Sequence, residues 1–140
     1  MPAANKFNLT VQAFVNGGNL NLAVSNDVSK LMLTNTVPVA TNNLYSDISG
    51  NELASGAGYT TGGATITTAS ANSSGTQTVT ATIANPTWTA TGNMGPFRYV
   101  VHYDSTTGQL LAWWDYGSSI TLTSGQTFTF TAASGLMTVQ

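Results

Sequence analysis

The chain has 140 residues, of which three are Lys or Arg, five are Asp or Glu, and none is Cys. A chain of this length is expected to form one domain with a sizeable core, and without cysteine it can hold neither disulfides nor thiolate metal sites. Because the basic side chains form no cluster and no apolar run is long enough to span a bilayer, we expect no nucleic-acid binding and no membrane association.

The most abundant residues are Thr, Ser, Asn, Gly and Ala, and only 6% of residues are charged. Thr favours strands, whereas Asn and Gly favour turns, so this composition predicts an all-β protein. A free monomer usually protects its surface with charge, so the shortage of charge favours a surface covered by neighbouring molecules. The opening "MPAANKFNLT" has no basic region followed by an apolar run, so we expect no signal peptide.

The first third of the chain has the least regular pattern. We treat residues 1–12 as an N-terminal arm and residues 13–140 as a single β domain. The segment "NLTVQAFVNGGN" fits either a strand that turns at Asn16–Asn19 or a short helix that ends at Gly17, and both remain open. "SKLMLTN" predicts a strand over residues 30–35, and "LYSDISGNELASGAGYTTGGA" predicts one helical turn within a long connection.

From residue 64 onward, apolar and polar residues alternate as in strands. "ATITTAS", "TQTVTATIANPTW", "SSITLTS", "GQTFTFTAA" and "GLMTVQ" each predict a short strand, and Pro86 ends or offsets the second. Residues 68–77, "TASANSSGTQ", are the most flexible candidate. Short strands at this spacing, separated by polar turns, predict an antiparallel β-sandwich or barrel-like domain with, in the first third, a short helix as the open alternative.

The strongest local prediction is a hairpin over residues 97–116. "FRYVVHYD" and "QLLAWWDY" are its strands, and Asp104–Gly108 is the turn. In the first strand, Phe97, Tyr99, Val101 and Tyr103 are expected on one face, with Arg98, Val100 and His102 on the other. In the second strand, the expected core face holds Leu110, Ala112, Trp114 and Tyr116, and the opposite face holds Leu111, Trp113 and Asp115. Trp113 is then partly exposed and available to a neighbouring molecule.

Catalytic patterns are weak. A Ser–His–Asp triad could be drawn from His102 and Asp104, but no serine lies in a nucleophile-elbow context, so His102 is interpreted as a surface or interface residue. Asp104 and Asp115 could be paired carboxylates across the hairpin, yet aspartates at strand ends usually serve turns. We therefore expect neither an enzyme nor a cofactor nor a metal site. Six aromatic residues could instead form a platform for stacking on sugars: Trp88, Tyr99, Tyr103, Trp113, Trp114 and Tyr116.

Three runs of the sequence carry a family resemblance: "FVNGGNLNLAVSNDVSKLMLTN", "YSDISGNELASGAGYTTGGATI", and "PTWTATGNMGPFRYVVHYDSTTGQLLAWWDYGSSITLTSGQTFTFTAASGLMTV". Over residues 13–140 their order resembles a family of small structural proteins of tailed bacteriophages. The arm departs from the family's usual opening. Trp113 and Trp114 stand where the family more often has smaller apolar residues, so these indoles are candidates for contacts specific to this protein.

The resemblance implies a β-rich virion component, made in the cytoplasm of the bacterial host and located on the capsid surface. It implies a head decoration (cement) protein that binds the major capsid protein and forms a homo-oligomer, of which a trimer is one form. Our candidate interface is Trp113, Asp115, Arg98 and His102. The alternative is a receptor- or carbohydrate-binding module of a head or tail fibre.

Overall fold

We analysed a computed structural model that describes residues 2–15, 28–73, 78–83, 85–131 and 138–139. The elements in chain order are β1 (Ala4–Lys6), α1 (Asn8–Val15), β2 (Ser29–Thr34), η1 (Tyr45–Asp47), η2 (Ser49–Asn51), β3 (Ala64–Ile66), β4 (Thr68–Ser73), β5 (Thr78–Ile83), β6 (Thr87–Thr89), β7 (Met94–Asp104), β8 (Leu110–Leu122), β9 (Thr127–Thr129) and β10 (Thr138–Val139). The turn expected at residues 16–19 lies outside the described residues.

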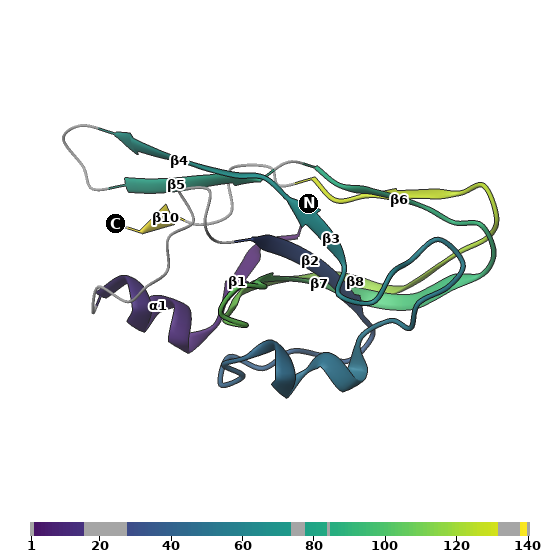
Figure 1. The fold of residues 1–140 in the computed structure, drawn as a ribbon, viewed down its shortest axis with the longest axis horizontal. Helices are drawn as coiled ribbons and strands as arrows, with labels where there is room; N and C mark the ends of the chain where they lie inside the picture. The colour runs from purple at the N-terminus through teal and green to yellow at the C-terminus, as the bar shows by residue number, and fades with distance from the viewer. Residues whose placement is uncertain (1, 16–27, 74–77, 84, 132–137, 140) are drawn as a thin grey trace.

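The strands form antiparallel sheets in a single domain (Figure 1). The main sheet has five strands in the order β1-β8-β7-β2-β3, a second has the order β10-β5-β4, and β6 pairs with β9. In Figure 1 the β6–β9 pair lies on one side of the main sheet, and η1 and η2 lie on the other. The prediction of a single antiparallel β domain is confirmed, and of the two alternatives left open for "NLTVQAFVNGGN" the structure has the short helix, α1.

The β4–β5 ribbon extends beyond the end of the main sheet (Figure 1). Its register runs from Thr68↔Ile83 to Ser73↔Thr78. The first six residues of the stretch expected to be most flexible therefore form β4, whereas residues 74–77 lie outside the described part of the chain.

The predicted hairpin forms, and β8 continues past its expected end to Leu122. β7 pairs with β8 from Met94↔Leu122 to Tyr103↔Leu110, and the turn closes with a bond from the Gly108 amide to the Asp104 carbonyl (2.8 Å). Between the pairs His102↔Ala112 and Tyr103↔Leu110, Leu111 is an extra residue and forms a β-bulge.

The bulge explains why residues 8–15 form a helix rather than a strand. The Thr10 hydroxyl lies 2.8 Å from the Leu110 carbonyl oxygen and 3.0 Å from that of Leu111, and the Phe7 amide also donates to Leu111. Phe7 and Thr10 are three residues apart, which is the spacing of one helix face. Both are fully buried, so docking on β8 selects the helix over the strand.

The larger core fills the space between the main sheet and the β6–β9 pair. Trp114 packs edge-to-face on Phe130, with 4.7 Å between ring centroids, and Phe128 packs on Phe97 in the same way (4.9 Å). The buried members of this cluster are Leu31, Leu33, Tyr59, Ile66, Trp88, Ala90, Met94, Phe97, Val100, Leu111, Ala112, Trp114, Leu122, Phe128 and Phe130.

A second, smaller core covers the opposite face of the main sheet. Phe7 from the arm and Ile48 from the η1–η2 segment close over it, and Tyr45 stacks on Tyr103 with 4.5 Å between ring centroids. Its buried members are Phe7, Met32, Ile48, Val101, Tyr103 and Leu110, and Trp113 packs against them. The hairpin therefore has no fully open face.

The predicted faces need two corrections. Phe97 packs with Val100 in the larger core rather than with Val101 and Tyr103, because the pairing shifts register between Phe97 and Tyr99. Leu110 was expected in the larger core and Leu111 on the opposite face, but the bulge reverses them. Leu111 lies in the larger core and Leu110 in the smaller one. The assignment of Trp114 to the main core and Trp113 to the other face is confirmed.

Replacing Trp114 with Ala removes a side chain that is 2% exposed and packed against Phe130, so we expect a loss of about 3–5 kcal/mol in the free energy of unfolding. Trp113→Ala removes a half-buried indole and its contact with Phe7, so we expect a smaller loss of roughly 1–2 kcal/mol. Urea unfolding of both variants measures the difference. Equal losses would contradict the burial difference between the two indoles.

Candidate functional site

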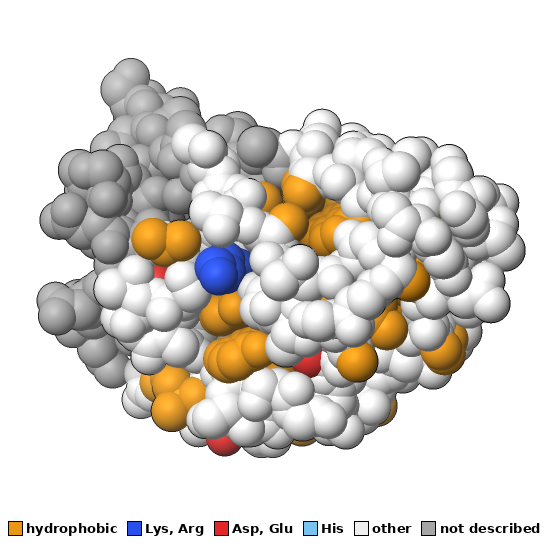
Figure 2. Space-filling view, turned by 45° about the vertical axis from the view of Figure 1, so that its right-hand side comes forward, with side chains coloured by type: hydrophobic (Ala, Val, Ile, Leu, Met, Phe, Trp, Pro, Cys, Tyr) orange, Lys and Arg blue, Asp and Glu red, His pale blue; other side chains and the backbone are white. Residues whose placement is uncertain are grey.

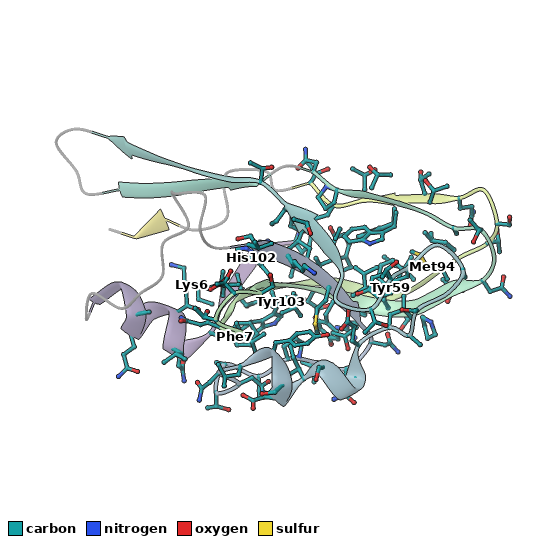
Figure 3. The ribbon with its side chains drawn as sticks, in the orientation of Figure 1. Lys6, Phe7, Tyr59, Met94, His102 and Tyr103 are labelled. Atoms are coloured by element: carbon teal, nitrogen blue, oxygen red, sulfur yellow. The ribbon has the colours of Figure 1, made fainter. Side chains whose placement is uncertain are left out.

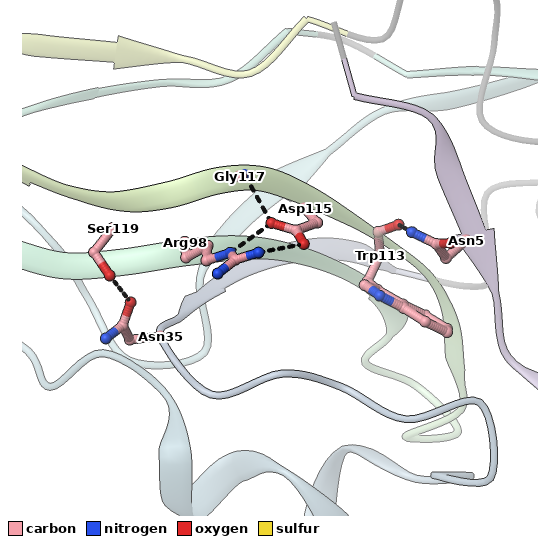
Figure 4. Close-up of polar contacts among 7 residues, drawn as sticks. All are labelled: Asn5, Asn35, Arg98, Trp113, Asp115, Gly117 and Ser119. Carbon is pink, nitrogen blue, oxygen red and sulfur yellow. Dashed lines mark hydrogen bonds and ion pairs between the residues drawn. The ribbon is translucent and has the colours of Figure 1, made fainter.

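The outer side of the β7–β8 hairpin carries an ion pair that joins two of the candidate interface residues (Figure 4). Arg98 donates from Nε to Asp115 Oδ1 (2.7 Å) and from Nη2 to Oδ2 (2.8 Å), which is bidentate geometry. The Gly117 amide also donates to Oδ1 (2.7 Å). The two side chains are 36% and 37% exposed, so the pair can be reached from solvent.

These contacts fix the charges of the pair. Hydrogen bonding from Arg98, and then from the Gly117 amide, holds the pKa of Asp115 below its ordinary value, and Asp115 raises the pKa of Arg98. The Arg98 guanidinium also lies 5.2 Å from the centre of the Tyr99 ring. The pair is therefore a preformed, mutually neutralised group on the surface.

Trp113 lies on the same strand as Asp115 and is half-buried. Its ring is tilted against Phe7, with 4.5 Å between centroids, and the Asn5 side chain approaches its carbonyl oxygen at 3.5 Å (Figure 4). The indole therefore has a partner within its own chain, which corrects the expectation that this face is covered only by another molecule. The residue as a whole is only partly buried.

The expectation that His102 lies at the surface is wrong. The ring is fully buried on β7, where its cross-strand neighbours are Leu31 and Ala112 (Figure 3). Neither ring nitrogen has a hydrogen-bond partner among the described residues, and burial lowers the pKa to about 3. His102 is therefore neutral at ordinary pH and cannot contact a partner molecule, because both faces of the sheet are covered.

The residues considered for catalysis are used by the fold. Asp104 is buried and accepts hydrogen bonds from the amides of Thr106 and Thr107, so it serves the turn as expected. Ser29 lies opposite Asp104 in the β2–β7 register, but among the described residues its hydroxyl bonds neither to His102 nor to Asp104. In the described part of the chain, no group of three or more His, Asp or Glu side chains could hold a metal ion.

The sequence did not reveal one of the well-connected carboxylates of the fold, the side chain of Glu52. Its Oε1 accepts from the Tyr59 hydroxyl (2.5 Å) and the Gly62 amide (2.7 Å), and its Oε2 accepts from the Tyr45 hydroxyl. Tyr59 in turn accepts from the Leu33 amide of β2 (3.0 Å). A signal was present, because this is the only glutamate and a tyrosine lies seven residues away on either side.

This group ties the long connection to both cores. Tyr59 belongs to the larger core and Tyr45 packs on the smaller one, while the Tyr103 hydroxyl donates to the Gly62 carbonyl (2.6 Å). Burial, followed by the bond to Glu52, raises the pKa of Tyr45 and of Tyr59, and burial raises the pKa of Tyr103 to about 12. The three hydroxyls therefore remain protonated donors.

The same connection requires a glycine next to the Glu52 group. Gly63 has φ +74°, and a Cβ there would lie 2.0 Å from the Leu31 carbonyl oxygen of β2. Only a residue without a side chain lets the backbone lie this close to the sheet. The "GYTTGG" run is therefore explained by packing of backbone on backbone.

The expected aromatic platform does not form on one surface. Trp88, Trp114, Tyr99 and Tyr103 are buried, and of the proposed platform only Trp113 and Tyr116 are half-exposed. Among the described residues, no helix has the length and apolar character that a membrane crossing requires. No family model matches the chain, and neither a curated protein nor a solved structure shows significant similarity to it.

Glu52→Gln removes the charge that three donors face, so we expect a loss of about 2 kcal/mol or more in the free energy of unfolding, measured by urea titration. Asp47→Asn is the control. Asp47 is an exposed carboxylate that accepts from the Asn43 and Leu44 amides, and Asn retains an acceptor there, so we expect a change below about 1 kcal/mol. Equal effects would contradict a central role for Glu52.

His102 is expected to make the fold sensitive to acid. The unfolded chain takes up a proton at the ordinary pKa of 6.5, whereas the folded chain does so only near 3. Between these values the unfolded state binds more protons, so stability falls as pH falls, by about 1.4 kcal/mol per pH unit from this group.

Urea unfolding of the wild type and of His102→Met near pH 7 and about pH 4.5 isolates this contribution, because the carboxylates are common to both proteins. We expect the wild type to lose roughly 2–3 kcal/mol more than the variant over this range. Equal losses would show that the ring is not held neutral.

Proposed function

We propose that the chain is a structural protein of the virion of a tailed bacteriophage, a head decoration (cement) protein that binds the outer surface of the major capsid protein. The family resemblance of residues 13–140 suggests this role. The observation that carries it is a surface with few charged side chains. The chain has three Lys or Arg and five Asp or Glu residues, Arg98 and Asp115 neutralise each other, and few charged side chains appear on the face in Figure 2.

A surface with few charges suits dense packing on a shell. Copies that lie side by side repel one another little, and each contact relies on apolar area and hydrogen bonds rather than on steering by charge. A contact of standard size buries about 1,600 Å² in total, and repetition over a lattice strengthens modest contacts through multivalency. Association of copies into a homo-oligomer is part of the proposal.

The contact that we propose is centred on Trp113 and the Arg98–Asp115 pair. Trp and Arg are enriched in the energetically dominant parts of interfaces. Because the two charges already satisfy each other, covering them leaves no uncompensated buried charge. His102 is removed from the interface because it is buried within the chain.

The location test uses purified virions. Quantitative mass spectrometry and a cryo-EM map of the head are expected to show hundreds of copies distributed over the capsid surface. A few tens of copies at a vertex or at the tail tip would overturn the decoration role in favour of a fibre module.

Binding to heads that lack the protein tests the contact. We expect the affinity to change little between low and high salt, because no unpaired charges meet. Trp113→Ala is expected to weaken binding by about 2 kcal/mol, and Val37→Ala, which truncates an apolar side chain 58% exposed elsewhere, serves as the control. Steep salt dependence, or equal binding of both variants, would contradict this contact.

A further inference from the structure

A groove follows the part of the β8 edge that the arm leaves uncovered. β1 pairs with β8 only over Ala112–Trp114, so from Asp115 onward the outer edge of β8 has no strand partner among the described residues. The groove has a volume of about 530 Å³, which lies within the range of small-molecule sites. Its walls are formed by Pro2, Asp115, Tyr116, Gly117, Thr129 and Thr131.

The polar groups of this groove are hydroxyls and one neutralised carboxylate. Asp115 accepts three hydrogen bonds, from two nitrogens of Arg98 and from the Gly117 amide, and a carboxylate has about four acceptor positions, so it can accept one more. The hydroxyls of Tyr116 and Thr131 have no hydrogen-bond partner among the described residues. Because Arg98 balances the charge of Asp115, the groove offers directed hydrogen bonds without net attraction for an ion.

The apolar part of the groove is formed by Tyr116 and Pro2. Tyr116 packs edge-to-face on Phe128, with 5.1 Å between ring centroids, so its ring is supported from the core side. Pro2 adds a second ring-shaped apolar wall. An additional peptide strand fits this edge poorly, because Gly117 has φ +83° and interrupts the extended backbone that strand addition needs.

We propose that this groove binds a neutral pyranose sugar. A pyranose has C–H faces that pack on Tyr116 and Pro2, and it has hydroxyls that donate to Asp115 and exchange hydrogen bonds with Tyr116 and Thr131. The buried aromatic residues leave no wider platform, so the site takes one or two sugar units. The proposal does not rest on the virion role, because sugar binding is measured on the free protein, although Asp115 belongs both to the groove and to the proposed capsid contact.

The test is a titration of the full-length protein, followed by two-dimensional ¹H–¹⁵N NMR, with the methyl pyranosides of glucose, galactose, mannose and N-acetylglucosamine at millimolar concentration. We expect at least one of them to produce saturable shifts at the amides of Asp115–Gly117 and Thr131. Glucuronic acid, which adds a negative charge, is expected to bind more weakly than glucose because Asp115 accepts from the ligand. The absence of saturable shifts with all four, shifts confined to other surfaces, or stronger binding of glucuronic acid would overturn the proposal.

Two isosteric variants locate the contact. Thr131→Val removes one groove hydroxyl and is expected to weaken binding of the best sugar by about two- to tenfold. Thr127→Val makes the same change on β9 outside the groove and is expected to leave the affinity unchanged. Equal affinities of the two variants would overturn the assigned site, and the wild-type titration stands even if one variant is poorly folded.

Discussion

The fold depends on the pairing of β7 with β8, because both cores are built on the two faces of this hairpin. A single extra residue, Leu111, divides the apolar side chains of β8 between the two cores and leaves carbonyl groups that Thr10 and Phe7 bind. The arm is thus held by the same irregularity that supplies Leu110 to the core beneath it. Adjacent tryptophans are possible on this strand because each face has its own cover within the chain.

Glu52 holds the long connection against the rest of the fold by hydrogen bonds, as the carbonyl groups at the bulge hold Phe7 and Thr10 of the arm. The backbone amides and carbonyls of a connection without regular strands need hydrogen-bond partners other than a neighbouring strand. Here the Glu52 carboxylate accepts hydrogen bonds from one backbone amide and from two tyrosine hydroxyls. Because each tyrosine belongs to a different core, the carboxylate couples the two layers across the edge of the main sheet. A partly buried polar network of this kind favours one arrangement of the connection over others.

Local patterns predicted most of the strands, the turn at Asp104–Gly108 and the side of each tryptophan, because alternation and turn chemistry act over a few residues. They did not predict β1, which is a strand only through its pairing with β8. The choice between helix and strand for residues 8–15 could not be made locally, since it is set by docking on the Leu110 and Leu111 carbonyls. The face of Phe97 and the burial of His102 were misjudged for two reasons. Register shifts reverse the alternation, and a sheet covered on both sides has no outer face for a polar ring. Arg98 and Asp115 were predicted from the sequence as candidate interface residues, but the bidentate ion pair between them was not.

The distribution of charge links the fold to the proposed role. Most proteins of this size keep their solubility through exposed charge, whereas here the few charges are largely engaged in fixing the backbone: Asp104 in a turn, Asp47 at η1, and Glu52 in the connection. The Arg98–Asp115 pair presents both signs of charge together on the outer side of the hairpin. A neighbour that covers this pair meets oriented donors and acceptors whose charges balance, so geometric fit contributes more than net charge to the choice of surface. That property suits a protein whose partner is a repeated, rigid surface better than one that must capture a charged ligand from solution.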